Sequence, residues 1–158
     1  MSEKKILVVY YSRDGGTERV AKEIAGKLNA DIEAIIDQKS RKGILGWLSA
    51  GKDATFKRET TIGNIEKNPA DYEITIIGTP MWAGSMTPAV RTYINKFKRS
   101  VKNTAYFVVA IGMPPDKVVK SMEELAGITA KGFVGFVHRD FKKKETYEEK
   151  IKNFVCLF

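Results

Sequence analysis

Short apolar runs and helical patterns alternate along the chain. Three runs, 6–11, 74–78 and 105–111, contain few polar residues, which is typical of strands buried on both faces of a sheet. The run 31–36 alternates apolar and polar residues and predicts an edge strand with one face less buried. A fifth short run, 133–137, predicts the last strand.

Each predicted strand is followed by a segment in which apolar residues recur at helical spacing. Thr87 is a good N-cap for the third helix, with Pro88 as its first residue, and Gly127 is suited to end the fourth. Thr146 and Glu149 form a capping-box pattern at the start of the last helix. The order of elements is therefore βα repeated five times.

Segment 39–48, after the second predicted strand, combines basic residues with apolar ones. We expect it to form the second crossover helix, with Trp47 and Leu48 packed on the sheet. The alternative is an exposed apolar patch that meets an anionic membrane or an acidic partner protein.

Alternating β and α elements predict a parallel sheet with helices on both faces. We expect one α/β domain over residues 1–158, with a doubly wound five-stranded parallel sheet in the strand order 2-1-3-4-5. Such sheets bind ligands at the carboxyl ends of their strands, where the strand order reverses, here between strands 1 and 3. The loops after Tyr11 and Gly78 are therefore the most important ones.

The first of these loops reads Ser12-Arg13-Asp14-Gly15-Gly16-Thr17. Its glycines allow a tight turn, and the free amides and dipole of the following helix favour an anion. Taken alone, the loop is equally compatible with an ordinary helix start. It lacks the G-x-x-x-x-G-K-[ST] and G-x-G-x-x-G patterns of triphosphate and dinucleotide sites, which leaves a monophosphate as the best candidate ligand.

The second loop begins Thr79-Pro80-Met81-Trp82-Ala83-Gly84. Trp82 offers a flat apolar surface for stacking on a heteroaromatic ring, and its place in a Pro/Gly-rich loop favours exposure over packing on the sheet. Ala83 and Gly84 keep the backbone accessible, so peptide groups can hydrogen-bond the polar edge of a ring.

At these two loops the sequence resembles the flavodoxin-like family of FMN-binding proteins. The first-loop pattern of that family is a hydroxyl residue, any residue, Thr, Gly, any residue, Thr, which Ser12, Gly15 and Thr17 match. The resemblance implies FMN as the cofactor. The cofactor-binding residues that it implies are Ser12, Arg13, Asp14, Gly15, Gly16, Thr17, Thr79, Pro80, Met81, Trp82, Ala83, Gly84, Gly112 and Met113.

Two departures from the family pattern concern this site. Asp14 stands where the family usually has Thr, so either its side chain turns outward, or Arg13 offsets its charge, or binding is weak. The third loop, 111–115, lacks the acidic and aromatic residues of typical flavodoxins. Met113 can cover the dimethylbenzene edge of a flavin there, and Gly112 can give it an amide.

Composition and charge narrow the range of partners. The chain has 158 residues, and no apolar run approaches the roughly 20 residues that span a bilayer. Its net charge is +8 and its pI is near 9.5, whereas typical flavodoxins are acidic. We interpret this as a solvated basic surface that suits an acidic redox partner. The chain has a single cysteine, Cys156, which excludes an internal disulfide and fits a cytoplasmic protein. We expect Cys156 to be buried.

Two functions on this fold compete, and a third comes from another class. We favour an FMN-containing electron carrier, because the sequence has one histidine, His138, and no acid–base pair. The alternative is an NAD(P)H-dependent reductase of quinones, flavins or nitro compounds, for which no sequence feature supplies a nicotinamide pocket. A basic binding module without flavin is the third possibility. No nucleic-acid partner is expected, because no RNA- or DNA-binding motif is present.

Overall fold

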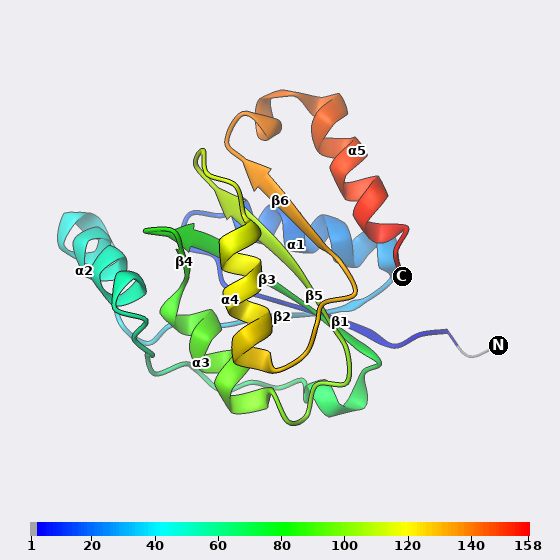
Figure 1. The fold of residues 1–158 in the computed structure, drawn as a ribbon, viewed down its shortest axis with the longest axis horizontal. Coiled ribbons are helices and arrows are strands. Elements are labelled where there is room, and N and C mark those ends of the chain that lie inside the picture. The colour runs from blue at the N-terminus through cyan, green and yellow to red at the C-terminus, as the bar shows by residue number, and fades with distance from the viewer. Residues whose placement is uncertain (1–2) are drawn as a thin grey trace.

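The computed structural model describes residues 3–158 as a sheet covered by helices on both faces (Figure 1). The strands are β1 (Ile6–Tyr10), β2 (Asp31–Ala34), β3 (Ile74–Trp82), β4 (Ser85–Met86), β5 (Thr104–Ala110) and β6 (Phe133–Val137). The helices are α1 (Gly16–Leu28), α2 (Gly43–Thr55), α3 (Pro88–Phe97), α4 (Asp116–Ala126) and α5 (Lys144–Val155), with short 3-10 turns at Pro69–Asp71 and Asp140–Lys142. Each expected strand and helix is present, and β4 is an addition.

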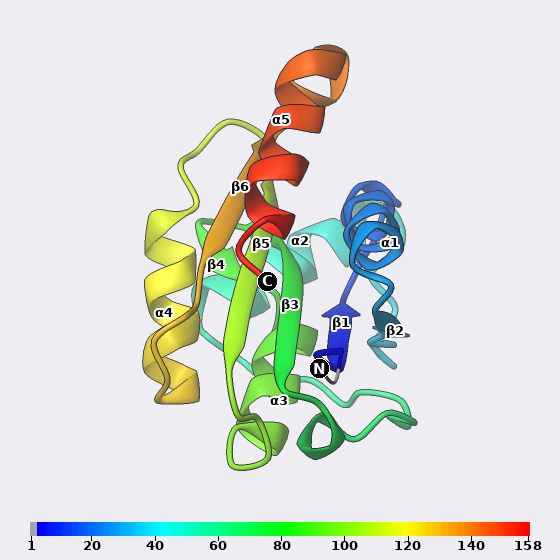
Figure 2. The ribbon, with the colours of Figure 1, turned by 90° about the vertical axis from the view of Figure 1, so that its right-hand side faces the viewer.

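The strand order confirms the predicted doubly wound topology. The five longer strands pair in parallel in the order β2-β1-β3-β5-β6, and the short β4 pairs antiparallel to the end of β3. Tyr10 at the end of β1 lies opposite Gly78 of β3. The helices lie on both sides of the sheet, with α4 on one side and α1 on the other in Figure 2. The strand order therefore reverses between β1 and β3.

Successive strand residues point into two different apolar cores. Between the sheet and helices α1 and α5, the core includes Ile76 and Phe107. Between the sheet and helices α3 and α4, it includes the next residues in sequence, Ile77 and Val108. Burial on both faces explains why the central strands are apolar without alternation. Gly78 is required as well, because a Cβ at this position would overlap the Phe107 ring.

The edge strand β2 is less simple than its pattern predicts. Its polar residue Glu33 is buried, and Ile36 beyond the strand is exposed. The Glu33 carboxylate accepts hydrogen bonds from the backbone N–H groups of Glu66 (3.2 Å) and Lys67 (3.3 Å). β2 is the edge strand that its pattern predicts, with Asp31 exposed, but Glu33 is buried because the chain leading into β3 covers it.

The helix ends agree with the sequence at two of three places. Thr87 Oγ1 accepts a hydrogen bond from Val90 N (3.4 Å) at the start of α3, and Gly127 ends α4 with a φ of 72°. The capping box at Thr146 is wrong, because α5 begins earlier, at Lys144. The 3-10 turn before α5 runs directly into the helix, so Thr146 falls inside the first turn.

The C-terminal residues correct a further expectation. Cys156 is exposed rather than buried. The buried face of α5 consists of Tyr147, Ile151 and Phe154, and Cys156 follows the end of the helix outside that stripe. Within residues 3–158, no helix is long and apolar enough to cross a membrane.

Candidate functional site

A cavity of about 1050 Å³ opens at the carboxyl ends of β1 and β3. This volume is slightly above the usual range for ligand pockets, about 300–1000 Å³. Five parts of the chain line it: the loop after β1, the end of β3, helix α2, the end of β5 and the segment after β6. The cavity therefore lies at the reversal of strand order, where sheets of this topology bind ligands.

The loop after β1 brings together all six of its predicted site residues. Ser12, Arg13, Asp14, Gly15, Gly16 and Thr17 line the cavity. Gly15 has a φ of 94°, a conformation that side chains disfavour, and its N–H donates to Ser12 Oγ (3.1 Å). Gly15 is also the N-cap of α1 and has no side chain to cap it. The first-turn amides of α1 thus keep their capacity to bind an anion at the cavity.

The two charged residues of this loop have different surroundings. The Asp14 side chain is 86% exposed and lies 3.8 Å from Arg13 Nε. The Arg13 side chain is only 20% exposed. Two of the three explanations for the Asp14 carboxylate in this loop thus agree with the structure: the side chain turns to solvent, and Arg13 lies close enough to offset its charge.

The second predicted loop is a strand end and a tight hairpin. Thr79 and Pro80 continue β3 and pair with β5. The two residues of the hairpin turn between β3 and β4 both have positive φ, 48° at Ala83 and 73° at Gly84. Positive φ at both central residues is the requirement of a type I′ hairpin turn, which glycine meets easily and alanine does not. The hairpin fixes the backbone just after Trp82.

Trp82 is half-buried and forms part of the cavity lining. Its ring packs edge-on against Tyr11, with centroids 5.6 Å apart, and the Arg41 guanidinium lies 6.0 Å from its centre. Burial, with a smaller effect of the Asp37 carboxylate, raises the pKa of the Tyr11 phenol to about 12. The phenol is therefore neutral at physiological pH, and Trp82 is held between a neutral ring and a cation.

Helix α2 forms a wall of the cavity that the sequence did not indicate. Trp47 and Leu48 line the cavity and are 63% and 55% exposed, so the expectation that they pack on the sheet is wrong. The physical reason lies on the opposite face of α2, where the small residues Gly46, Ala50 and Ala54 are buried. Because small side chains let this face approach the body, the large apolar residues point outward.

A buried charge cluster holds α2 against the body. Arg41 Nη1 donates to Asp53 Oδ2 (2.6 Å), and Arg41 Nε donates to Asp37 Oδ2 (3.0 Å). Lys39 Nζ also lies 2.7 Å from Asp53 Oδ2. Burial alone would raise the pKa of Asp53, but hydrogen bonds from Lys39 and Arg41 outweigh burial and lower the pKa to about 2.

The remaining wall comes from β5 and β6, and it too was missed. Val109, Ala110 and Ile111 lie at the end of β5, while His138 and Phe141 follow β6. The strand order alone could have indicated these residues, because the carboxyl ends of parallel neighbours meet at one edge. Among the described residues, no group of three or more His, Cys, Asp or Glu side chains could hold a metal ion.

Some predicted site residues lie outside this cavity. Gly112 and Met113 line a separate hollow of about 180 Å³ next to β6. Thr79 is buried behind the hairpin, where its Oγ1 accepts a hydrogen bond from Thr87 N (3.2 Å), and Gly84 forms the turn. Ile111 still lines the main cavity, but residues 112–115 lie next to β6, where the Pro115 ring packs against Gly135.

Comparison with known proteins gives a family and a set of similar folds. The family model described as Flavodoxin matches residues 5–131. No curated protein sequence matches the chain. The solved structures described below are all less than 25% identical to it, so their likeness concerns the fold.

Three of the similar structures come from proteins of different kinds. A flavoprotein from Lactobacillus acidophilus in complex with FMN is 21% identical, with a TM-score of 0.70 over 91% of this chain and 99% of that one. A flavodoxin from the domain Archaea is 15% identical, with a TM-score of 0.55 over 94% of each chain. Rubredoxin oxygen:oxidoreductase from Desulfovibrio gigas is 17% identical, with a TM-score of 0.52 over 97% of this chain but only 37% of that one.

Proposed function

This chain belongs to the flavodoxin family, and from that premise we propose that it is an electron carrier that binds FMN and exchanges electrons with a partner protein. The observation that carries the proposal is the cavity at the ends of β1 and β3, with an uncapped helix N-terminus at one wall and Trp82 at another. A similar fold, the flavoprotein from Lactobacillus acidophilus, has been solved with FMN.

The cavity suits the two chemically different ends of FMN. For the phosphate it offers the first-turn amides of α1 and the hydroxyls of Ser12 and Thr17. For the flavin ring it offers the Trp82 indole and an apolar wall with Trp47. Arg13 supplies a positive charge, and the exposed Asp14 carboxylate points to solvent.

The protein and the cofactor have separate tasks. When bound, FMN supplies the one- and two-electron chemistry of its ring. The chain holds the phosphate on α1, orients the ring beside Trp82 and excludes water with the apolar residues of the cavity. No side chain has to donate or accept a proton for electron transfer. A partner that docks at the cavity mouth meets Arg13, Arg19 and Lys52, which favours an acidic protein in the cytoplasm.

One observation supports a second candidate function, an NAD(P)H-dependent flavin, quinone or nitro reductase. Such an enzyme needs space beside the flavin for a nicotinamide ring. The cavity volume of about 1050 Å³ and the apolar wall of α2 provide more space than the sequence suggested. Bleaching of bound FMN by NADPH or NADH alone would favour the reductase. Reduction only with an added reductase protein would favour the carrier.

Equilibrium titration of the flavin-free protein with FMN and with riboflavin tests the site. We expect quenching of flavin fluorescence and tighter binding of FMN, because riboflavin lacks the phosphate. Thr17→Val removes a hydroxyl that lines the cavity and keeps a similar shape. Loss of one charge-assisted hydrogen bond should weaken FMN about tenfold and leave riboflavin unchanged.

Riboflavin binding thus shows whether the Thr17→Val variant is folded. Thr146→Val, in α5, is the same substitution away from the cavity and should leave FMN binding unchanged. Absence of FMN binding at micromolar concentration would contradict the proposed cofactor. An equal loss of FMN and riboflavin would contradict the proposed phosphate position.

A further inference from the structure

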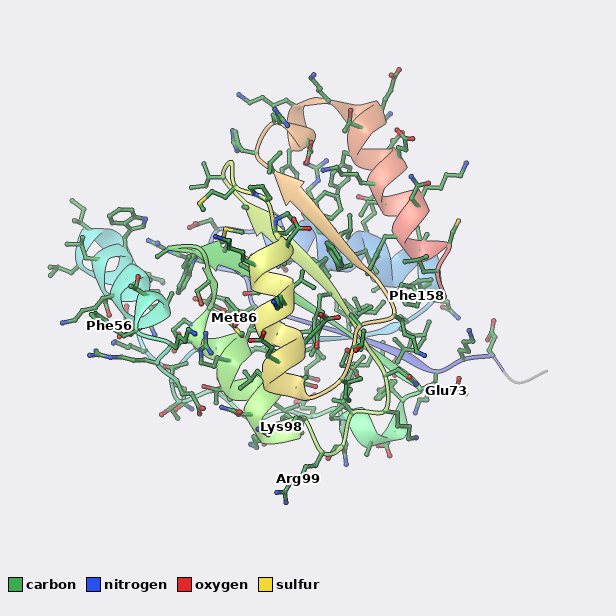
Figure 3. All side chains as sticks on the ribbon, in the orientation of Figure 1. Phe56, Glu73, Met86, Lys98, Arg99 and Phe158 are labelled. Carbon is green, nitrogen blue, oxygen red and sulfur yellow. The ribbon has the colours of Figure 1, made fainter. Side chains whose placement is uncertain are left out.

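The outer face of α2 carries exposed apolar side chains that the cavity does not account for. Ile44 is 80% and Leu45 is 83% exposed, and Phe56, labelled in Figure 3 at the end of α2, is 64% exposed. None of these three lines the cavity. Large aliphatic and aromatic side chains at such exposure, in the first turn of α2 and just after its last residue, are unusual together unless something covers them.

The charge around this face is positive and concentrated. Residues 38–58 contain six basic side chains and one acidic one, a net charge of +5 out of +8 for the whole chain. The one acidic residue, Asp53, is buried in ion pairs with Lys39 and Arg41. Lys42 and Lys57 flank α2 at its two ends and are exposed. Every exposed charge between residues 38 and 58 is therefore positive.

The position of α2 makes this surface accessible. The helix lies at the margin of the molecule, beyond β4 and α3 in Figure 1, and its buried face is narrow, with Gly46 directly against the backbone of Arg41. Because a Cβ at residue 46 would overlap that backbone, no larger side chain fits at this position of the buried face. The apolar face therefore points away from the body.

We propose that α2 is an interfacial helix that binds the surface of an anionic lipid bilayer. A helix with exposed Ile, Leu and Phe side chains and Lys around them lies in the plane of the membrane interface, with its apolar side chains among the lipids and its cations near the phosphates. The proposal does not depend on the proposed electron transfer, because it concerns the face of α2 outside the cavity.

Two other occupants fit the observations less well. In a symmetric dimer through α2, the positive charges of one copy would face those of the other, which is unfavourable. An acidic protein would need a groove for a projecting helix, whereas a bilayer receives it without a preformed shape. The test below has an outcome for each alternative: a stable dimer for the second copy, and a monomer that does not bind anionic vesicles for the acidic protein.

Co-sedimentation of the full chain with lipid vesicles tests the proposal. One set of vesicles contains phosphatidylcholine with about one-third phosphatidylglycerol, and the other contains phosphatidylcholine alone. We expect binding to the anionic set, weakening as salt increases, and at least about tenfold weaker binding to the neutral set.

Two paired variants separate the apolar and charged contributions. Ile44→Gln with Leu45→Gln should weaken binding to anionic vesicles at least about tenfold, whereas Leu157→Gln, at another exposed apolar residue, should not. Lys42→Gln with Lys57→Gln should weaken binding more than Lys27→Gln with Lys102→Gln, which changes the net charge by the same amount at exposed lysines elsewhere.

Sedimentation velocity in the absence of lipid completes the test. A monomer that binds anionic vesicles through α2 supports the proposal. A stable dimer that Ile44→Gln with Leu45→Gln dissociates would overturn it and assign the face to a second copy. No binding to anionic vesicles, or equal losses in the paired variants, would overturn it as well.

Discussion

Helices α3 and α2 are neighbours that pack on the same side of the sheet, and they are held there by different forces. α3 starts with a Thr87 cap and a proline, and it buries Val90, Tyr93 and Ile94. α2 has no side-chain cap at Lys42 and buries only Gly46, Ala50, Asp53 and Ala54. The large apolar residues of α3 mostly face the core, and those of α2 face outward.

The difference shows that one fold can hold two neighbouring helices by different interactions, α3 by apolar burial and α2 by ion pairs. Burial of large apolar side chains stabilises the packing of α3, as it stabilises the rest of the core. Ion pairs among Asp37, Arg41 and Asp53 hold α2, so its attachment depends on protonation and on a few specific atoms. Of these two helices only α2 lines the cavity, so this wall of the cavity can respond to its surroundings.

The largest effect is expected where the charge cluster loses its central cation. Arg41→Met leaves two buried carboxylates without their guanidinium, a change that costs about 3–5 kcal/mol. Hydrogen exchange should show loss of protection in residues 38–60 before the rest of the chain. Arg58→Met is the matched control, because that side chain is half-exposed and 3.5 Å from Asp53, and it should change stability by less than about 1 kcal/mol. Equal effects of the two variants would refute this account of the attachment.

The same substitution in both helices sharpens the contrast. Ile94→Ala creates a cavity in the core and should lower the free energy of unfolding by about 2–4 kcal/mol. Ile44→Ala removes an exposed side chain and should change it by less than about 0.5 kcal/mol. Urea unfolding measures both. If Ile44→Ala lowered the free energy of unfolding by more than about 1 kcal/mol, the outer face of α2 would have to be packed in solution, which would contradict the contrast.

The smallest expected effect is the response of α2 to acid. The pKa of Asp53 is lowered to about 2 from an ordinary 3.8, so its ion pairs stabilise the fold fully above pH 4 and are lost as the pH falls through 2. This shift corresponds to about 2 kcal/mol. The difference in stability between the protein and its Asp53→Asn variant should therefore shrink from about 2 kcal/mol at pH 6 toward zero near pH 2. A difference that stays constant with pH would contradict the ion-pair attachment.

The sheet and the first loop could be predicted because local sequence determines them. The central strands are apolar on both faces, and Thr87 with Pro88 marks a helix start without any tertiary contact. Ser12 to Thr17 reach the cavity because the strand order alone places the start of α1 there. These features depend on periodicity and on backbone chemistry.

The orientation of α2 could not be predicted, because its sequence is apolar on two faces. Ile44, Leu45 and Leu48 form as good a stripe as Gly46, Ala50 and Ala54. The choice between them depends on Arg41, which joins Asp37 before the helix to Asp53 within it. The position of Gly112 and Met113 beside a separate hollow could not be predicted for a similar reason, since it accompanies the contact of Pro115 with Gly135 of β6. Both outcomes depend on contacts between residues far apart in the sequence.

Cys156 gives the molecule a single thiol for covalent attachment. It is the only cysteine of the chain, it is exposed, and it follows α5. The next residue, Leu157, packs against Gly132 just before β6, at the end of this strand opposite the cavity. A gold electrode or a thiol-reactive dye would therefore attach at one defined point without any engineered residue. The cavity would face the solution in every tethered molecule, which makes the chain suited to direct electrochemistry in a uniform orientation.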